Sequence, residues 1–118
     1  MTKPLAFVIE DDPQLSRIFT LVLGERFETV TITDGLQALA HLSETVPALV
    51  VLDINLPGAS GGEILSVIRS VSRFESTRVI ITTADSHAAT EIQEKADIVL
   101  LKPISVAQLR DLASRLKP

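Results

Sequence analysis

Four short apolar runs in this sequence each end in side chains that can bind a phosphate group or a metal ion. The runs and the residues that follow them are LAFVI with Glu10-Asp11-Asp12, ALVVL with Asp53, RVII with Thr82-Thr83, and IVLL with Lys102-Pro103. If the runs are parallel strands, their carboxyl ends meet at one edge of the sheet, where ligands bind in open α/β folds. Carboxylates, a hydroxyl and an ammonium would then converge on one small site, which predicts phosphate chemistry.

The acidic residues of this set need a cation if they lie close together. At an effective dielectric of about 20, two like charges about 4 Å apart repel by about 4 kcal/mol. Mg²⁺ binds through one or two carboxylates, keeps several waters and completes its shell with phosphate oxygens. We therefore expect a Mg²⁺ site here. The alternative is that these acids bind no metal and instead cap helices or are hydrated at the surface. Capping fits Asp12 best, because Pro13 follows it and suits a first helical turn.

Asp53 is the candidate nucleophile of the site. Aspartate carboxylates can form aspartyl-phosphate intermediates, and phosphoryl transfer depends mainly on positioning and on neutralising charge. The hydroxyl of Thr83 could help to position a phosphoryl group, and the compact positive charge of Lys102 could neutralise a phosphoryl oxygen.

The apolar runs alternate with longer amphipathic segments, which predicts repeated βα units and a parallel sheet. The expected strands lie near 5–10, 27–32, 48–53, 78–83 and 97–101. The third and fourth are almost continuous Val, Ile and Leu, as in strands covered on both faces. The second alternates in polarity and is expected at an edge. The prediction is one domain, 1–118, with a doubly wound, five-stranded α/β sandwich.

Helices are expected between these strands, each with an apolar face in helical register. The faces are Ile18, Phe19, Val22 and Leu23 after Pro13; Leu36, Leu39 and Leu42 in 35–45; Ile64, Leu65 and Ile68 in 63–71; and Leu109, Leu112 and Leu116 in 105–116. Breakers mark the connections: Pro57-Gly58 and Gly61-Gly62 predict a loop after Asp53.

Composition limits the remaining classes of function. The 118 residues are 46% apolar, with four Phe and neither Trp nor Tyr, so the core should be aliphatic. The absence of cysteine excludes disulfides and thiolate metal sites. The net charge is −4, and without the four acids of the candidate site it is −4 + 4 = 0, so the acidity can be assigned to that site. The sequence also contains no basic stripe of the kind that binds nucleic acid. No stretch reaches the length of a membrane span, and a cytoplasmic protein is expected.

The motifs VIEDDP, VVLDINLPGASGGE, VIITTAD and LLKPIS occur in the order that response-regulator receiver domains show, and the chain resembles this family over essentially its full length. The resemblance implies a flavodoxin-like (βα)5 fold with strand order 2-1-3-4-5. It also implies a two-component signalling switch that takes a phosphoryl group from a histidine kinase or phosphotransfer protein. Apart from accepting this group and hydrolysing it, no enzymatic activity is implied.

The resemblance assigns a role to each matching residue. Asp53 would accept the phosphoryl group; Asp11, Asp53 and the backbone carbonyl of Asn55 would bind Mg²⁺ directly, and Glu10 through water. Thr83 and Lys102 would bind the phosphoryl oxygens and shift on phosphorylation, and the Lys102-Pro103 bond is expected to be cis. A downstream protein would bind through the 84–110 face, and a homodimer is compatible with the same face.

Two positions depart from the family pattern. Val99 stands where the family usually has Tyr or Phe as a switch, and the interval of 19 residues from Thr83 to Lys102 is shorter than usual. These changes predict a trimmed fourth helix or exit loop and a smaller conformational response.

Three alternatives stay open. The chain could be a pseudo-receiver that binds partners without phosphorylation, or a receiver excised from a longer regulator or hybrid kinase. A Mg²⁺ phosphohydrolase is disfavoured, because such enzymes usually carry a second acid two residues after the nucleophile, where this chain has Asn55.

Overall fold

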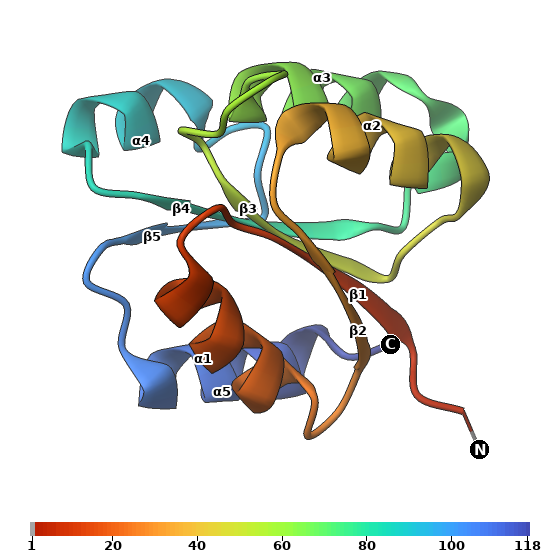
Figure 1. The fold of residues 1–118 in the computed structure, drawn as a ribbon, viewed down its shortest axis with the longest axis vertical. Helices are drawn as coiled ribbons and strands as arrows, with labels where there is room; N and C mark the ends of the chain where they lie inside the picture. The colour runs from red at the N-terminus through yellow and green to blue at the C-terminus, as the bar shows by residue number, and fades with distance from the viewer. Residues whose placement is uncertain (1) are drawn as a thin grey trace.

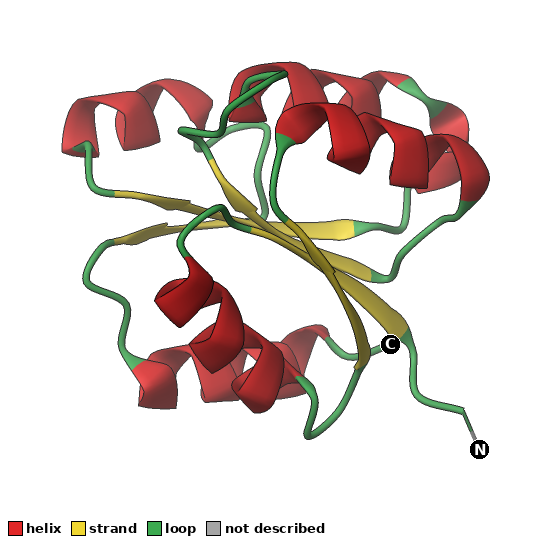
Figure 2. Cartoon of the chain, viewed as in Figure 1, coloured by secondary structure: helices red, strands yellow, loops and turns green. Residues whose placement is uncertain are grey.

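A parallel five-stranded sheet lies between two layers of helices in the computed structural model, which describes residues 2–118. The strand order is β2-β1-β3-β4-β5, as predicted. Figure 1 shows α2, α3 and α4 on one face of the sheet and α1 and α5 on the other. The same two layers of helices around the strands are visible in Figure 2.

The strands are β1 (Leu5–Ile9), β2 (Glu28–Ile32), β3 (Leu49–Asp53), β4 (Arg78–Thr83) and β5 (Ile98–Leu101). The helices are α1 (Pro13–Leu23), α2 (Gly35–Glu44), α3 (Gly61–Ser70), α4 (Ser86–Ile92) and α5 (Val106–Leu116), with a short 3-10 helix at Ser72–Phe74. Every strand boundary lies within one residue of its predicted position, and β2 is an edge strand as expected.

Each face of the sheet carries its own apolar core. Phe7, Val50 and Ile81 pack against the α2–α4 layer, whereas Val8 and Val51 pack against α1 and α5. Side chains alternate along a strand, so membership of one core or the other shows the face of the sheet to which each buried residue of β1, β3, β4 and β5 points. All five residues of β3 are buried, as expected for a central strand covered on both sides.

Two residues assigned to apolar helix faces point outward instead. Ile18 is 40% exposed and Leu36 is 66% exposed. The buried side of α1 is formed by Ser16, Phe19, Val22 and Leu23, and that of α2 by Gly35, Ala38 and Leu42. The other predicted residues of α1, together with Leu42 of α2, are buried as expected. A rule that counts only large apolar residues misses the small residues of each buried face and wrongly includes Ile18 and Leu36.

The predicted loop at Gly61-Gly62 is wrong, because α3 begins at Gly61 rather than at residue 63. Ser60 caps this helix, and its hydroxyl accepts a hydrogen bond of 3.2 Å from the backbone N of Glu63. A Cβ on Gly61 would lie 2.6 Å from Cα of Ile54 and 2.8 Å from the carbonyl oxygen of Asp53. Glycine at position 61 thus lets α3 begin directly against the end of β3.

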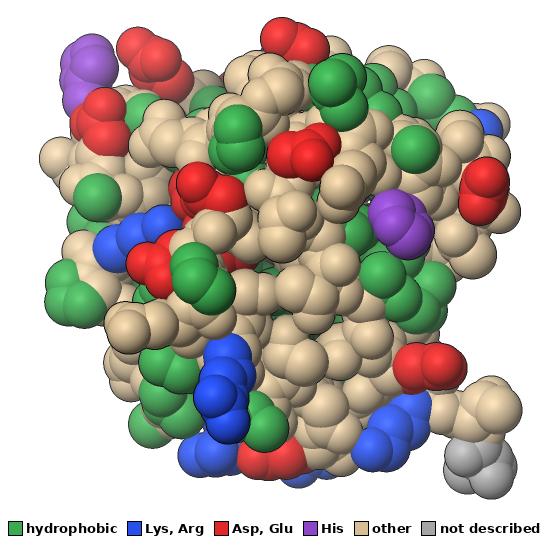
Figure 3. All heavy atoms as spheres, in the orientation of Figure 1, with side chains coloured by type: hydrophobic (Ala, Val, Ile, Leu, Met, Phe, Trp, Pro, Cys, Tyr) green, Lys and Arg blue, Asp and Glu red, His purple; other side chains and the backbone are tan. Residues whose placement is uncertain are grey.

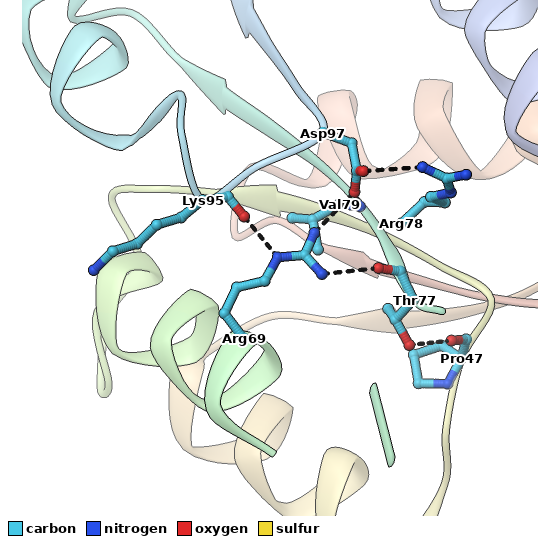
Figure 4. A network of polar contacts seen from close by, with 7 residues as sticks. All are labelled: Pro47, Arg69, Thr77, Arg78, Val79, Lys95 and Asp97. Carbon is cyan, nitrogen blue, oxygen red and sulfur yellow. Dashed lines mark hydrogen bonds and ion pairs between the residues drawn. The ribbon is translucent and has the colours of Figure 1, made fainter. Parts of the chain in front are cut away.

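A polar network at the opposite end of the sheet fixes the segment between α4 and β5 (Figure 4). Its centre is the Asp97 carboxylate, which accepts hydrogen bonds from Arg69 of α3, Arg78 of β4 and the backbone N of Val79. Arg69 also donates to the backbone carbonyls of Lys95 and Thr77. The helix α4, which precedes this segment, has seven residues, against ten or eleven in the other described α-helices.

None of the helices within residues 2–118 has both the length and the apolar character needed to cross a membrane.

The packing of α3 on β3 predicts opposite effects at two adjacent glycines. Gly61→Ala forces a methyl group into the backbone of Ile54 and Asp53 and should lower the free energy of unfolding by about 1–3 kcal/mol. Gly62→Ala is the matched control, since its nearest neighbour, the Ser60 hydroxyl, would be 3.8 Å from the new Cβ. Because alanine favours a helix, Gly62→Ala should be neutral or stabilise by up to about 1 kcal/mol. Urea unfolding measures both, and equal effects would contradict the packing described.

Candidate functional site

Three carboxylates and one ammonium meet at the carboxyl edge of the sheet. Glu10 and Asp11 follow β1, Asp53 is the last residue of β3, and Lys102 follows β5. One oxygen from each carboxylate lies within 4.8 Å of the other two. The Lys102 ammonium lies 3.1 Å from Oε1 of Glu10 and 3.1 Å from Oδ2 of Asp53. The structure thus brings together the residues that the sequence placed at three different strand ends.

The site is buried on the Glu10 and Asp53 side and open on the Asp11 side. Glu10 is 1% exposed and Asp53 is 4% exposed, whereas Asp11 is exposed. Burial raises the pKa of the Glu10 carboxyl to about 7, and a hydrogen bond with Asp53 adds to this shift while Lys102 opposes it. Burial alone would lower the pKa of the Lys102 ammonium, but its bonds with Glu10 and Asp53 outweigh burial and raise that pKa. Lys102 therefore stays charged.

Local backbone bonds hold the acids in place. The backbone N of Asn55 donates to Oδ1 of Asp53 at 3.0 Å, which orients that carboxylate beyond the strand end. Asp12 instead accepts from the backbone N of Gln14 (2.9 Å) and of Leu15 (3.3 Å). The prediction that Asp12 caps α1 is confirmed, and the carboxylate cluster contains Glu10, Asp11 and Asp53 without Asp12.

Thr83 lies at the end of β4 but points away from this cluster. It is fully buried, and its hydroxyl accepts a hydrogen bond of 3.0 Å from the backbone N of Asp85. Since Ile81 belongs to the α2–α4 core, strand alternation places Thr83 on that face as well. The arrangement joins Thr83 to the loop that leads into α4 rather than to Asp53.

Two further expectations concern β5. The Lys102-Pro103 bond is cis, as predicted. Val99 is partly buried and packs, like Ile92 and Ala96, against the α2–α4 core, so no aromatic side chain is available at this position.

The donor set fits a small divalent cation. Oε1 of Glu10 is buried and lacks a hydrogen bond of acceptable geometry, although the Lys102 ammonium is close by. Three carboxylates against one ammonium leave the formal charge negative, and hard oxygen donors of this kind suit such a cation.

Sequence reasoning recorded Thr82 as a strand-end residue but selected only Thr83 for the site. Thr82 is the register partner of Asp53 and is 1% exposed. The signal that distinguishes the two threonines is strand alternation, which places Thr82 on the Asp53 face.

Comparisons with known proteins agree with this geometry. The family model described as "Response regulator receiver domain" matches residues 6–114. The chain belongs to the response-regulator receiver family.

Individual relatives show the same class. The DNA-binding response regulator MtrA of Mycolicibacterium smegmatis is 36% identical over 103 residues, which cover 86% of this chain and 45% of the relative. The transcriptional regulatory protein BaeR of Escherichia coli is 28% identical over 98% of this chain and 50% of its own length. The chain thus spans about half the length of these curated relatives.

Solved structures share the fold over almost the whole chain. The chemotaxis response regulator CheY4 of Vibrio cholerae has a TM-score of 0.87 at 22% identity, covering 98% of this chain and 99% of that one. The BeF3-activated DrrB receiver domain has a TM-score of 0.87 at 26% identity and covers 98% and 97%.

The raised pKa of Glu10 predicts a pH-dependent effect of Glu10→Gln on metal-free protein. Between pH 4.5 and about 7 the folded state retains a proton on Glu10 that the unfolded state releases. Glu10 therefore lowers the free energy of unfolding as the pH rises through this range. Glutamine removes that dependence. The unfolding free energy of Glu10→Gln minus that of the parent should therefore increase from pH 5 to pH 8, by about 2 kcal/mol. Urea unfolding of both proteins in the presence of a chelator measures this difference in unfolding free energy. A difference that does not change with pH would contradict the burial of the Glu10 carboxylate.

Proposed function

We propose that Asp53 accepts a phosphoryl group from the phosphohistidine of a histidine kinase or phosphotransfer protein, and that residues 1–118 act as one phosphorylation-dependent signalling switch. One observation carries the proposal: the Asp53 carboxylate lies beside two other carboxylates and within 3.1 Å of the Lys102 ammonium. Glu10, Asp11, Asp53 and the backbone carbonyl of Asn55 would hold Mg²⁺, which supplies charge neutralisation for the phosphoryl oxygens when bound.

In the proposed step, one carboxylate oxygen of Asp53 forms a bond to phosphorus while the bond from phosphorus to the donor imidazole nitrogen breaks. The imidazole leaves with its electron pair and takes up a proton. Lys102 then pairs with a phosphoryl oxygen in place of the carboxylate charge, and the Thr83 hydroxyl turns toward the same group. Water later hydrolyses the acyl phosphate, and the rate of this hydrolysis is proposed to depend on Asn55 and Asp85, the polar residues two positions after Asp53 and two positions after Thr83.

A cleft beside the site supports access for the phosphodonor. It has a volume of about 460 Å³ and is lined by Glu10, Asp11 and residues of α1 and β2. Two apolar side chains of α1, Ile18 and Leu21, are 40% and 67% exposed. A partner that delivers the phosphoryl group can therefore pack against α1 while its imidazole reaches Asp53.

The output is proposed to run through the 84–110 face. Thr83 is bonded to Asp85, so movement of its hydroxyl releases the loop before α4. Leu101 and Val106 expose 50% and 40% of their surface on this face and offer apolar contacts to a downstream protein or a second copy. Because Val99 replaces the usual aromatic, the response is proposed to be smaller than in receivers with that residue.

Direct binding of nucleic acid is not proposed for these residues. The face in Figure 3 shows Lys and Arg interspersed with Asp and Glu, without a broad area of one charge. MtrA is described as DNA-binding, but the chain matches only part of its length. A cytoplasmic location stays a prediction from the family.

Phosphorylation at Asp53 is tested by incubating the protein with acetyl phosphate and Mg²⁺ and measuring its intact mass. One phosphoryl group should add to the parent and to Asp12→Asn, whose side chain still caps α1. Asp53→Ala should gain none. No addition to the parent favours the pseudo-receiver, and addition to Asp53→Ala contradicts the assigned residue.

The metal site predicts different Mg²⁺ requirements for two adjacent aspartates. Asp11→Asn removes a carboxylate of the cluster, whereas Asp12→Asn changes only the helix cap. Loss of even an outer partner costs roughly 10–100-fold in metal affinity. The Mg²⁺ concentration for half-maximal phosphorylation should therefore rise at least about tenfold in Asp11→Asn and stay nearly constant in Asp12→Asn. Equal shifts in both variants would contradict the proposed ligand set.

A further inference from the structure

The loop that follows Asp53 packs against the start of helix α2. The backbone N of Gly35, the first residue of α2, donates a hydrogen bond of 2.9 Å to the carbonyl of Pro57 in this loop. Gly35 is buried, as is Ala59 of the same loop. A Cβ on Gly35 would overlap the carbonyl oxygen of Ala59 and would lie 2.5 Å from its carbonyl carbon. Glycine at position 35 is therefore required for α2 to lie this close to the loop.

The same loop carries a backbone carbonyl that is proposed to bind Mg²⁺. The backbone N of Asn55 donates to Oδ1 of Asp53 at 3.0 Å, so the start of the loop is tied to the carboxylate cluster. The carbonyls of Ile54 and Pro57 both accept hydrogen bonds from backbone N–H groups. Across residues 2–118, no backbone N–H is bonded in this way to the carbonyl of Asn55. Its oxygen is thus available for another partner.

Gly35 gives this loop a support from outside its own strand and helix. The backbone of Ile54, at the start of the loop, is bonded to β4 and to α3. For residues 55–60 in the described chain, the hydrogen bonds lead to β3 and α3, except the bond from Gly35 to Pro57. A loop held in one backbone arrangement has already lost the conformational entropy that a bound ligand would otherwise have to offset.

We propose that Gly35 is a positioning residue for the metal site: the close contact between α2 and the loop at Pro57 and Ala59 holds the carbonyl of Asn55 in place for a divalent cation. A side chain at position 35 must displace the loop or the helix, because the atoms that it meets belong to the main chain of Ala59. This role rests on the proposed Mg²⁺ site and not on the phosphorylation of Asp53.

Gly35→Ala tests the role through Mg²⁺ affinity, read from the amide signal of Asn55 in an NMR titration with Mg²⁺. The dissociation constant should rise roughly tenfold, since loss of a group that orients a metal ligand lowers affinity on this scale. Without metal, the same signal should already differ between Gly35→Ala and the parent, because the backbone of the loop has moved.

Thr77→Val is the control for a general loss of stability. Thr77 is 2% exposed and donates a hydrogen bond of 2.8 Å to the carbonyl of Pro47 at the opposite end of the sheet (Figure 4). Loss of this buried bond should lower the stability of the fold and leave the Mg²⁺ affinity unchanged. A parent-like dissociation constant in folded Gly35→Ala, or an equal rise in Thr77→Val, would overturn the positioning role.

Hydrogen exchange in the parent protein gives the answer if Gly35→Ala does not fold. If Mg²⁺ binds only while the loop is held, the amide of Gly35 should exchange roughly tenfold more slowly at a Mg²⁺ concentration of about ten times the dissociation constant. The amide of Thr45, bonded to the carbonyl of His41 at the other end of α2, should exchange at an unchanged rate. No slowing at Gly35, or equal slowing at both amides, would contradict the proposal.

Incubation of the parent with acetyl phosphate separates this role from the proposed function. A parent that binds Mg²⁺ but gains no phosphoryl group contradicts the phosphoacceptor function, and the Mg²⁺ titrations still decide the role of Gly35. A parent that binds no Mg²⁺ overturns the role of Gly35 together with the metal site.

Discussion

One ammonium between two buried carboxylates is the interaction on which this site depends. Glu10 and Asp53 lie side by side with almost no exposure to water, where their mutual repulsion is poorly screened. Lys102 offsets that repulsion by lying 3.1 Å from both. Burial raises the pKa of Glu10, the neighbouring Asp53 raises it further, and Lys102 opposes only part of this shift; a site of this charge favours a further cation.

The parallel sheet makes this contact available because its strand ends meet at one edge. β1 and β3 are neighbours and bring Glu10 beside Asp53, whereas Lys102 must reach across β4. The close start of α3 at Gly61 holds the end of β3, and the Asp97 network holds the entry of β5 at the other end. The scaffold thus fixes the strands, and the groups that change partners lie at the strand ends or directly after them.

The alternation of apolar runs with amphipathic segments predicted the strand positions and the parallel sheet well, whereas the strand order was implied by the resemblance to receiver domains. Helix faces were less predictable: Ile18 and Leu36 are exposed, whereas the small residues Ser16 and Gly35 are buried. Within the site, residue types indicated Glu10, Asp11, Asp53 and Lys102. Alternation along β4 predicts that Thr82 and Thr83 point to opposite faces, but the pairing of Thr82 with Asp53 required the register of β4 against β3, which one strand's sequence does not contain.

The central claim is that Lys102 leaves the carboxylates for a phosphoryl group on Asp53. A crystal structure of the chain with Mg²⁺ and beryllofluoride, a phosphoryl mimic, tests it most directly. The account predicts beryllofluoride on one carboxylate oxygen of Asp53, with the Lys102 ammonium bonded to a fluoride and separated from Glu10. An unmodified Asp53, with Lys102 still bridging Glu10 and Asp53 in the presence of both reagents, would contradict it.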